Sequence, residues 1–168
     1  MRILGIDPGY GITGFGLVEA QRGQFQLLRC GAITTPAGMD FSARLEIIYE
    51  DMNKLLEVAK PDAVAIEELF FGQNVTTGIG VAQSRGVILL AIRQAGLEVF
   101  SYKPMQVKQA VVGYGNATNH QVQDMTRRLL HLNEMPKPDD AADAIAIALC
   151  HGRSSTSLLA QAQKNNPF

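Results

Sequence analysis

The sequence predicts an α/β fold with a mixed five-stranded sheet and helices on both faces. Three strand-like segments come first, and they are expected to form an antiparallel meander. Helical and strand-like segments then alternate, so the later strands should return through helical crossovers. The predicted strands are 2–7, 12–20, 25–34, 63–68 and 97–102, and the predicted helices are 41–59, 75–95, 104–112, 119–131 and one that begins near 139.

Local signals place the strands. The segment "RILGID" at 2–7 is an apolar run that ends in one acidic residue. Arg22 and Gly23 separate the second and third strand-like segments, which indicates a hairpin between them. The segment "AVAIEE" at 63–68 is short and almost continuously apolar, as strands covered on both faces are.

Helical periodicity and breakers place the helices. Apolar residues recur at helical spacing in 41–59, Gly96 is a stop signal, and Pro104 can begin a helix. The last helix contains "AADAIAIAL", whose apolar residues leave no polar face and so indicate a buried helix. We therefore expect one domain over 1–152, followed by a polar, flexible tail over 153–168.

Composition excludes several classes of protein. The chain has 168 residues, of which 46% are hydrophobic, so it can bury a core and is not a disordered chain. The apolar runs at 87–92 and 144–150 are too short to span a membrane, and no signal peptide precedes the first strand. Cys30 and Cys150 lie in apolar surroundings, which favours reduced thiols and a cytoplasmic location without membrane contact.

Asp7 is followed by glycines whose spacing raises the question of a nucleotide-binding loop. Gly9, Gly11 and Gly14 satisfy the pattern G-x-G-x-x-G. A dinucleotide site needs a helix directly after these glycines, whereas 12–20 has the pattern of a strand. The segment is therefore interpreted as a strand that ends in Asp7 and a tight turn, although Asp7 alone could simply accept hydrogen bonds within that turn.

Further carboxylates occur where ligands gather in α/β proteins. Glu67 ends the apolar strand at 63–68, although a strand-end residue can also be merely solvated. Asp139 and Asp140 begin the last helix, where acidic residues serve as caps, and Asp143 lies among apolar residues one turn later. A buried carboxylate must be paired, protonated or bound to metal, and capping cannot explain Asp143.

Asp7, Glu67, Asp140 and Asp143 are therefore candidate catalytic residues and metal ligands. Carboxylate oxygens without His or Cys suit Mg²⁺ or Mn²⁺ better than zinc. Several carboxylates can hold two such ions, which would activate a water and stabilise the leaving oxygen of a phosphodiester. The sequence thus predicts two ions in each active site of a nuclease.

Four motifs carry a resemblance to a known family. "GIDPG…TGFG" near residue 5, "AIEELFF" at 65–71, "QVKQAVVGYG" at 106–115 and "DDAADAIAIA" at 139–148 resemble the RuvC family of Holliday-junction resolvases. The resemblance implies a ribonuclease-H-like fold, a homodimer, and metal-dependent, symmetric paired nicking of four-way DNA junctions in recombination and repair. It also implies a branch-migration complex of RuvA- and RuvB-type proteins as partner, and it places the family's four acidic residues on the four carboxylates above.

The resemblance also implies DNA contacts. Phe70 matches an aromatic residue that stacks on unpaired bases, although a core role is equally open, and Lys108 matches a basic residue close to the scissile phosphate. Where relatives often carry a second basic residue, this chain has Asn119, followed by His120. The remaining expected phosphate contacts are Lys103, Arg127 and Arg128.

A formal net charge of −1 is low for a DNA-binding protein, but metal ions on four carboxylates would make the balance positive. Small and apolar residues in 75–95 make this helix the candidate dimer interface, although core packing could also explain them. Three other readings stay open: a ribonuclease of the same fold, a non-catalytic junction-binding protein, and an actin-like ATPase, which would need about twice this length.

Overall fold

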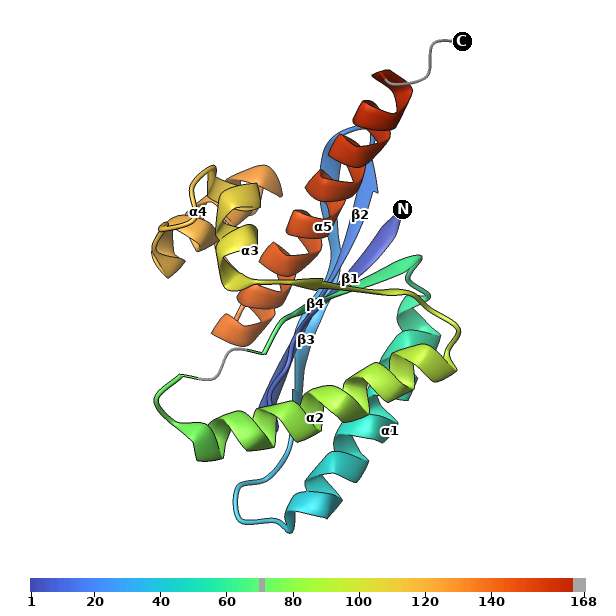
Figure 1. The fold of residues 1–168 in the computed structure, drawn as a ribbon, viewed down its shortest axis with the longest axis vertical. Helices are drawn as coiled ribbons and strands as arrows, with labels where there is room; N and C mark the ends of the chain where they lie inside the picture. The colour runs from blue at the N-terminus through green and yellow to red at the C-terminus, as the bar shows by residue number, and fades with distance from the viewer. Residues whose placement is uncertain (70–71, 165–168) are drawn as a thin grey trace.

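The computed structural model describes residues 1–69 and 72–164, and it has the predicted α/β architecture (Figure 1). All predicted strands and helices are present, with ends that differ by a few residues at most except at the last helix. The elements are β1 (Arg2–Asp7), β2 (Ile12–Gln21), β3 (Gln24–Thr34), α1 (Phe41–Ala59), β4 (Ala63–Glu67), α2 (Val75–Gln94), β5 (Val99–Tyr102), α3 (Pro104–Val112), α4 (Asn119–Leu129) and α5 (Asp139–Lys164).

The strands form one mixed sheet in the order β3-β2-β1-β4-β5. β1, β2 and β3 pair antiparallel, which confirms the predicted meander. β4 is parallel to β1, and β5 is parallel to β4, because α1 and α2 form the crossovers between them. The carboxyl ends of β1, β4 and β5 therefore meet at one edge of the sheet.

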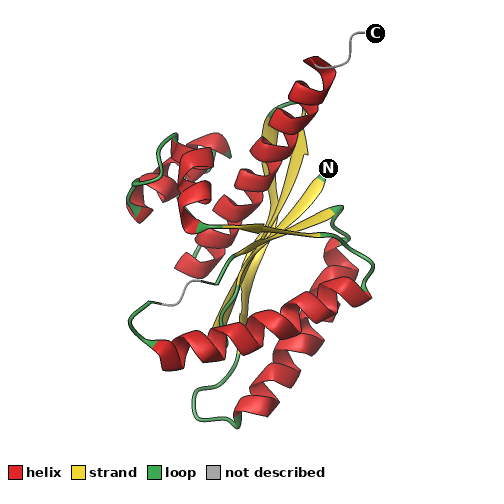
Figure 2. Ribbon diagram, viewed as in Figure 1, coloured by secondary structure: helices red, strands yellow, loops and turns green. Residues whose placement is uncertain are grey.

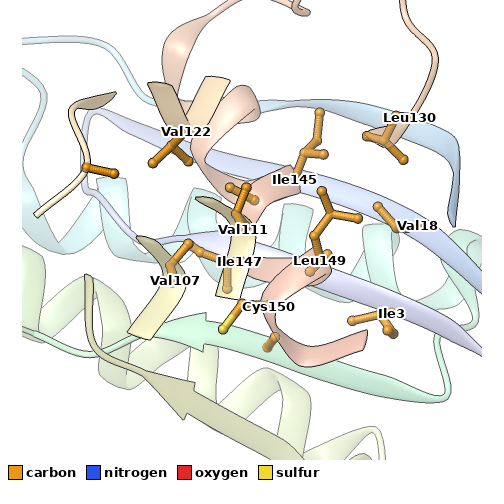
Figure 3. Close-up of a cluster of buried hydrophobic side chains, with 14 residues drawn as sticks. Ile3, Val18, Val107, Val111, Val122, Leu130, Ile145, Ile147, Leu149 and Cys150 are labelled. Atoms are coloured by element: carbon orange, nitrogen blue, oxygen red, sulfur yellow. The ribbon is translucent and has the colours of Figure 1, made fainter. Parts of the chain in front are cut away.

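Helices cover both faces of the sheet, as predicted (Figures 1 and 2). Leu4 and Ile6 point toward α1 and α2, whereas Ile3 and Gly5 point toward α5, as the alternation of a strand requires. α5 lies against the sheet, and α3 and α4 pack on the outer side of α5. Figure 3 shows the buried cluster between these helices and the sheet, to which α5 contributes Ile145, Ile147 and Leu149.

Glycines in β1 and β2 allow α5 to lie unusually close to the sheet. A Cβ atom on Gly5 would lie 2.0 Å from the backbone oxygen of Ala144, and one on Gly14 would lie 2.0 Å from the backbone oxygen of Asp140. Any side chain at either position would push the helix away. Of the three glycines that resemble a nucleotide-binding pattern, Gly14 therefore lets α5 lie against the sheet.

The last helix runs past Gly152, the last residue of the expected domain. α5 continues to Lys164, because residues 153–164 contain no glycine or proline. A Cβ atom on Gly152 would lie 2.5 Å from Phe25, so this glycine permits close packing against β3 and does not end the helix. Secondary structure thus does not change at residue 153, and the division into a domain and a flexible tail stays a prediction.

α2 is the one helix in the described part of the chain that is long and apolar enough to cross a membrane. That test considers only length and composition, and core helices also pass it. In this fold α2 packs against α1, and Ile88, Ala91 and Ile92 are buried in the core.

Candidate active site

Asp7 and Glu67 end two neighbouring parallel strands. Ile6 of β1 lies opposite Ile66 of β4, so the two acidic residues come next on strands that are about 4.8 Å apart. Gly5 and Ala65, two residues earlier, face α5. Because side chains alternate along a strand, Asp7 and Glu67 also point toward the α5 side of the sheet.

Asp140 and Asp143 approach the same point from α5. Gly14 pairs with Asp7 across β1 and β2, and Gly14 is also the residue that lies against the backbone of Asp140. The first turn of α5 therefore begins beside the end of β1. Asp140 and Asp143 are three residues apart and share one side of the helix.

The four carboxylates influence one another electrostatically. Burial raises the pKa of Asp7 from 3.8 to about 8, and the negative charges of Glu67, Asp143 and Asp140 add to this effect. Burial, and then the charge of Asp143, raises the pKa of Glu67, while Lys108 opposes the shift. Partial desolvation of the Asp143 carboxyl, followed by the charges of Asp140 and Asp139, raises the pKa of Asp143 although the residue as a whole is exposed. The cluster thus concentrates negative charge that a cation would stabilise.

The expectation that Asp143 is buried was wrong. Ala142 and Ala144 are buried, but the residue between them is exposed. The first turn of α5 lies at the edge of the sheet, so one side of the helix is open there even though its neighbours are apolar. Burial of Asp143 therefore cannot be used against a non-catalytic role, and the argument for catalysis depends on the four acids together.

Lys108 and Asn119 complete the surroundings of the carboxylates. A cavity of about 190 Å³ is lined by Glu67 and Asp143 on one side and by Lys108 of α3 and Asn119 of α4 on the other. Lys108 is near enough to Glu67 to affect its pKa. The structure thus brings two of the predicted DNA-contacting residues to the four acids.

Other predicted DNA contacts lie elsewhere. Arg127 and Arg128 both form ion pairs with Asp124, and Arg128 lines a separate cavity of about 460 Å³ beside the β2–β3 hairpin. Lys103 is exposed and lines a different hollow together with Lys108. His120 is exposed next to Asn119 at the start of α4, and Phe70 lies outside the described residues.

The supporting contacts of the site were missed by the sequence reasoning. Nε of Arg85 on α2 donates a hydrogen bond to the backbone oxygen of Glu67 at 3.1 Å. The hydroxyl groups of Thr13 and Ser84 donate to the backbone oxygen of Gly9 at 2.6 and 2.7 Å, and they hold the turn after Asp7. A basic residue inside the apolar stretch 75–95 was the available signal for Arg85.

The donor chemistry of the four acids fits divalent cations, because all their ligand atoms are carboxylate oxygens. Within 1–69 and 72–164, no three His, Cys, Asp or Glu side chains are close enough together to form a metal cage. The four acids therefore lie around one point, but no three of their side chains are close enough together to coordinate one ion in this arrangement. The raised pKa values have the direction expected for carboxylates that repel one another without a cation.

Fold and site together define an α/β nuclease of the ribonuclease-H-like class. The model of the family "Crossover junction endodeoxyribonuclease RuvC" matches residues 3–151. A crossover junction endodeoxyribonuclease RuvC from Ruminiclostridium cellulolyticum is 51% identical over 154 residues, which cover 92% of this chain and 93% of that protein.

Solved structures of RuvC proteins have the same fold as this chain. The Thermus thermophilus RuvC structure superimposes with a TM-score of 0.87 at 36% identity, and the match covers 94% of this chain and 96% of that one. A second structure, of T. thermophilus RuvC in complex with a Holliday junction substrate, gives a TM-score of 0.85 at 34% identity over the same shares of the two chains. The chain therefore belongs to the RuvC family of crossover junction endodeoxyribonucleases, DNA-hydrolysing enzymes that use divalent metal ions.

Proposed function

We propose that this protein resolves four-way DNA junctions by paired, symmetric nicking at the site formed by Asp7, Glu67, Asp140 and Asp143. The observation that carries the proposal is the meeting of these four acids at the ends of β1 and β4, with Lys108 beside them. The complex of T. thermophilus RuvC with a Holliday junction substrate supports the choice of DNA structure.

The four acids would hold Mg²⁺ or Mn²⁺, with two ions in each site. Such ions activate a water and stabilise the leaving oxygen of a phosphodiester. Lys108 opposes the negative charge of Glu67, so a phosphate that enters the cavity meets a cation as well as the acids. Arg85 acts as a positioning residue, because it fixes the backbone at Glu67.

The contacts with DNA away from the four acids remain proposals. Phe70 would stack on unpaired bases, and Lys103 would hold a phosphate beside Lys108. His120 adds positive charge only when it is protonated. Arg127 and Arg128 share one carboxylate partner, Asp124, so we propose weaker phosphate contacts for them than for Lys108.

Asn119→Lys is expected to increase the affinity for junction DNA about tenfold near 0.2 M salt. The new ammonium group would enter the cavity that already contains Lys108, and each added phosphate contact steepens the salt dependence of binding. The measurement is fluorescence anisotropy of a labelled junction in EDTA over a series of salt concentrations. Asn53→Lys on α1 is the matched control, and an equal gain in affinity from both variants would contradict a local contact.

We propose that two copies assemble through α2. Val75, Ile79 and Leu90 are 57%, 50% and 52% exposed, and their spacing places them on one side of the helix. An exposed apolar stripe of this kind is typical of an interface between subunits. Two identical sites related by a two-fold axis would match a junction that is itself nearly two-fold symmetric.

Ile79→Glu is expected to convert the dimer into monomers, because it places a charge in the middle of the apolar stripe. Sedimentation velocity at micromolar concentration measures the change, and circular dichroism checks the fold. Val58→Glu serves as control, since Val58 is 61% exposed at the end of α1. A monomeric wild type, or a dimer that tolerates Ile79→Glu, would contradict an interface on α2.

A branch-migration complex of RuvA- and RuvB-type proteins would be the partner, and the cytoplasm the compartment. Both proposals follow from family membership, since such an enzyme needs access to chromosomal DNA. Co-purification of this chain with RuvA- and RuvB-type proteins on immobilised junction DNA tests the first, and fractionation of cells tests the second.

Cleavage assays test the proposed function as a whole. A mobile four-way junction and a linear duplex of the same sequence are incubated with EDTA, Mg²⁺ or Mn²⁺. Paired symmetric nicks on the junction alone, in the presence of metal, are the expected result. Binding without cleavage would indicate a junction-binding protein, and cleavage of RNA in place of DNA would indicate a ribonuclease of the same fold.

A further inference from the structure

The helix α2 contacts both strand ends that carry acids of the site. Ser84 and Arg85 are neighbours on this helix, and Ser84 is completely buried. The hydroxyl group of Ser84 donates to the backbone oxygen of Gly9, two residues after Asp7, at 2.7 Å. Nε of Arg85 donates to the backbone oxygen of Glu67 at 3.1 Å. Two adjacent residues of one helix therefore hold the backbone beside Asp7 and at Glu67 at the same time.

The turn after Asp7 also packs directly on α2. A Cβ atom on Gly80 would lie 2.7 Å from the ring of Tyr10, so this glycine lets the tyrosine lie close against the helix. The same ring contacts the edge of Phe41 and lies 5.0 Å from the guanidinium group of Arg44. Because the turn is packed between α2 and α1, a movement of α2 would also move the backbone that follows Asp7.

The apolar stripe that we propose as the dimer interface lies on a different side of α2. It contains Val75, Ile79 and Leu90. With 3.6 residues per turn, Ile79 and Leu90 point at least about 120° away from Ser84. Ile79 directly precedes Gly80, so the stripe and the contacts with the turn occur at the same level of the helix. A rigid helix can therefore connect the interface to the active site.

The start of α2 buries little surface within one protomer. Residues 75–77 and Ile79 are exposed, and Gly80 is the first buried residue of the helix. Segments with few buried apolar contacts open at a low cost in free energy. A second protomer that covers Val75 and Ile79 would therefore stabilise the turns of α2 that hold the active site (Figure 1).

We propose that the pairing of two protomers through α2 raises the affinity of each active site for divalent cations, and that Ser84 and Arg85 transmit the effect. The inference rests on the dimer and the metal site of the proposed function. Groups that are already held in place bind a ligand more tightly, because less conformational freedom is lost on binding. Such a coupling is reciprocal, so metal binding must strengthen the dimer by the same factor.

The test measures the affinity of the dimer with and without metal, in the absence of DNA. Sedimentation velocity of a fluorescently labelled protein over a dilution series gives the Kd of the dimer in EDTA and in saturating Mn²⁺. For the wild type, Mn²⁺ is expected to lower this Kd about tenfold. Ser84→Ala should still form dimers, but Mn²⁺ should change its Kd less than about twofold, because alanine cannot donate to Gly9. Arg85→Lys, which keeps the positive charge, should also reduce the effect.

Thr126→Val is the matched control for Ser84→Ala. Thr126 is likewise completely buried, but it lies on α4, which packs against α3 and α5. Its variant should show the full wild-type response to Mn²⁺. Neither substitution changes the charge of the protein, so a general loss of repulsion between protomers on metal binding would persist in both.

Hydrogen exchange gives a second readout that needs neither cleavage nor metal. In EDTA, the backbone amides of 8–13 should exchange more slowly in the wild-type dimer than in Ile79→Glu monomers. Ser84→Ala should exchange rapidly there even as a dimer, because its link between α2 and the turn is missing. Thr126→Val should match the wild type.

The outcomes separate the inference from the proposed function. A wild type that is monomeric at every concentration refutes the proposed interface and the inference with it, and a wild type that binds no Mn²⁺ refutes the proposed metal site and the inference. A dimer that binds Mn²⁺ without any change in its Kd refutes only the inference. The same holds if Ser84→Ala responds to Mn²⁺ as strongly as the wild type and Thr126→Val do.

Discussion

Asp7→Asn is expected to reduce junction cleavage at least about 1,000-fold and to leave junction binding intact. The Asp7 carboxyl interacts electrostatically with all three other acids, each of which raises its pKa. Without this carboxylate the site should bind cations more weakly. Such cations stabilise the transition state of phosphoryl transfer by several kcal/mol. Binding should be kept or improve, because one negative charge near the phosphate is removed.

The controls for Asp7→Asn use binding and a neighbouring acid. Anisotropy with a labelled junction in EDTA measures binding, and single-turnover cleavage in Mg²⁺ or Mn²⁺ measures activity. Asp139→Asn, which changes the exposed first residue of α5, should retain activity within a few-fold. A folded Asp7→Asn protein that cuts at the wild-type rate would contradict the assignment of the site.

The same residue makes stability depend on pH when no metal is present. The pKa of Asp7 is about 8 in the folded protein and 3.8 ordinarily, so the folded state binds its proton more tightly than the unfolded state does. Its contribution to stability is complete below about pH 4 and is lost as the pH rises through about 8. In EDTA, Asp7→Asn should therefore be more stable than the wild type at pH 8, whereas the two should be nearly equal at pH 4.

Gly14→Ala is expected to destabilise the protein by about 3 kcal/mol and to reduce cleavage about 100-fold. The new Cβ atom would lie 2.0 Å from the backbone oxygen of Asp140, and neither strand nor helix can move freely there. If the start of α5 shifts by about 1 Å, Asp140 and Asp143 no longer face Asp7 and Glu67 correctly.

Urea denaturation and single-turnover cleavage measure the two effects of Gly14→Ala. Gly72→Ala is the matched control, because a Cβ atom on Gly72 would have no neighbour within 4 Å among residues 1–69 and 72–164, which the structure describes. That variant should stay within about 0.5 kcal/mol of the wild type. Wild-type stability of Gly14→Ala would contradict the close approach of α5 to the sheet at Gly14.

The sequence predicted the elements well because their signals are local. The apolar runs at 2–7 and 63–68 already predict that Asp7 and Glu67 lie at strand ends, and parallel pairing then brings the two together. The spacing of Asp140 and Asp143 likewise predicts that they share one side of a helix.

Features that depend on contacts between distant segments were not predicted. Gly14 and Asp140 are far apart in the chain but are in contact in the fold. Only the folded structure reveals that this glycine allows α5 to pack closely against the sheet. Gly152 resembles a helix stop, but it packs against Phe25. Exposure of Asp143 depends on where α5 meets the edge of the sheet, and the composition of the helix cannot indicate that position.

Whether the four acids hold the metal ions is best decided by counting bound Mn²⁺. The wild type, Asp143→Asn and Asp139→Asn are titrated with Mn²⁺ in the absence of DNA and again with a non-cleavable junction, and free Mn²⁺ is followed by electron paramagnetic resonance. With junction bound, the wild type and Asp139→Asn should bind about two ions per protomer, and Asp143→Asn at most one. Equal binding by all three proteins would contradict a metal site formed by these carboxylates.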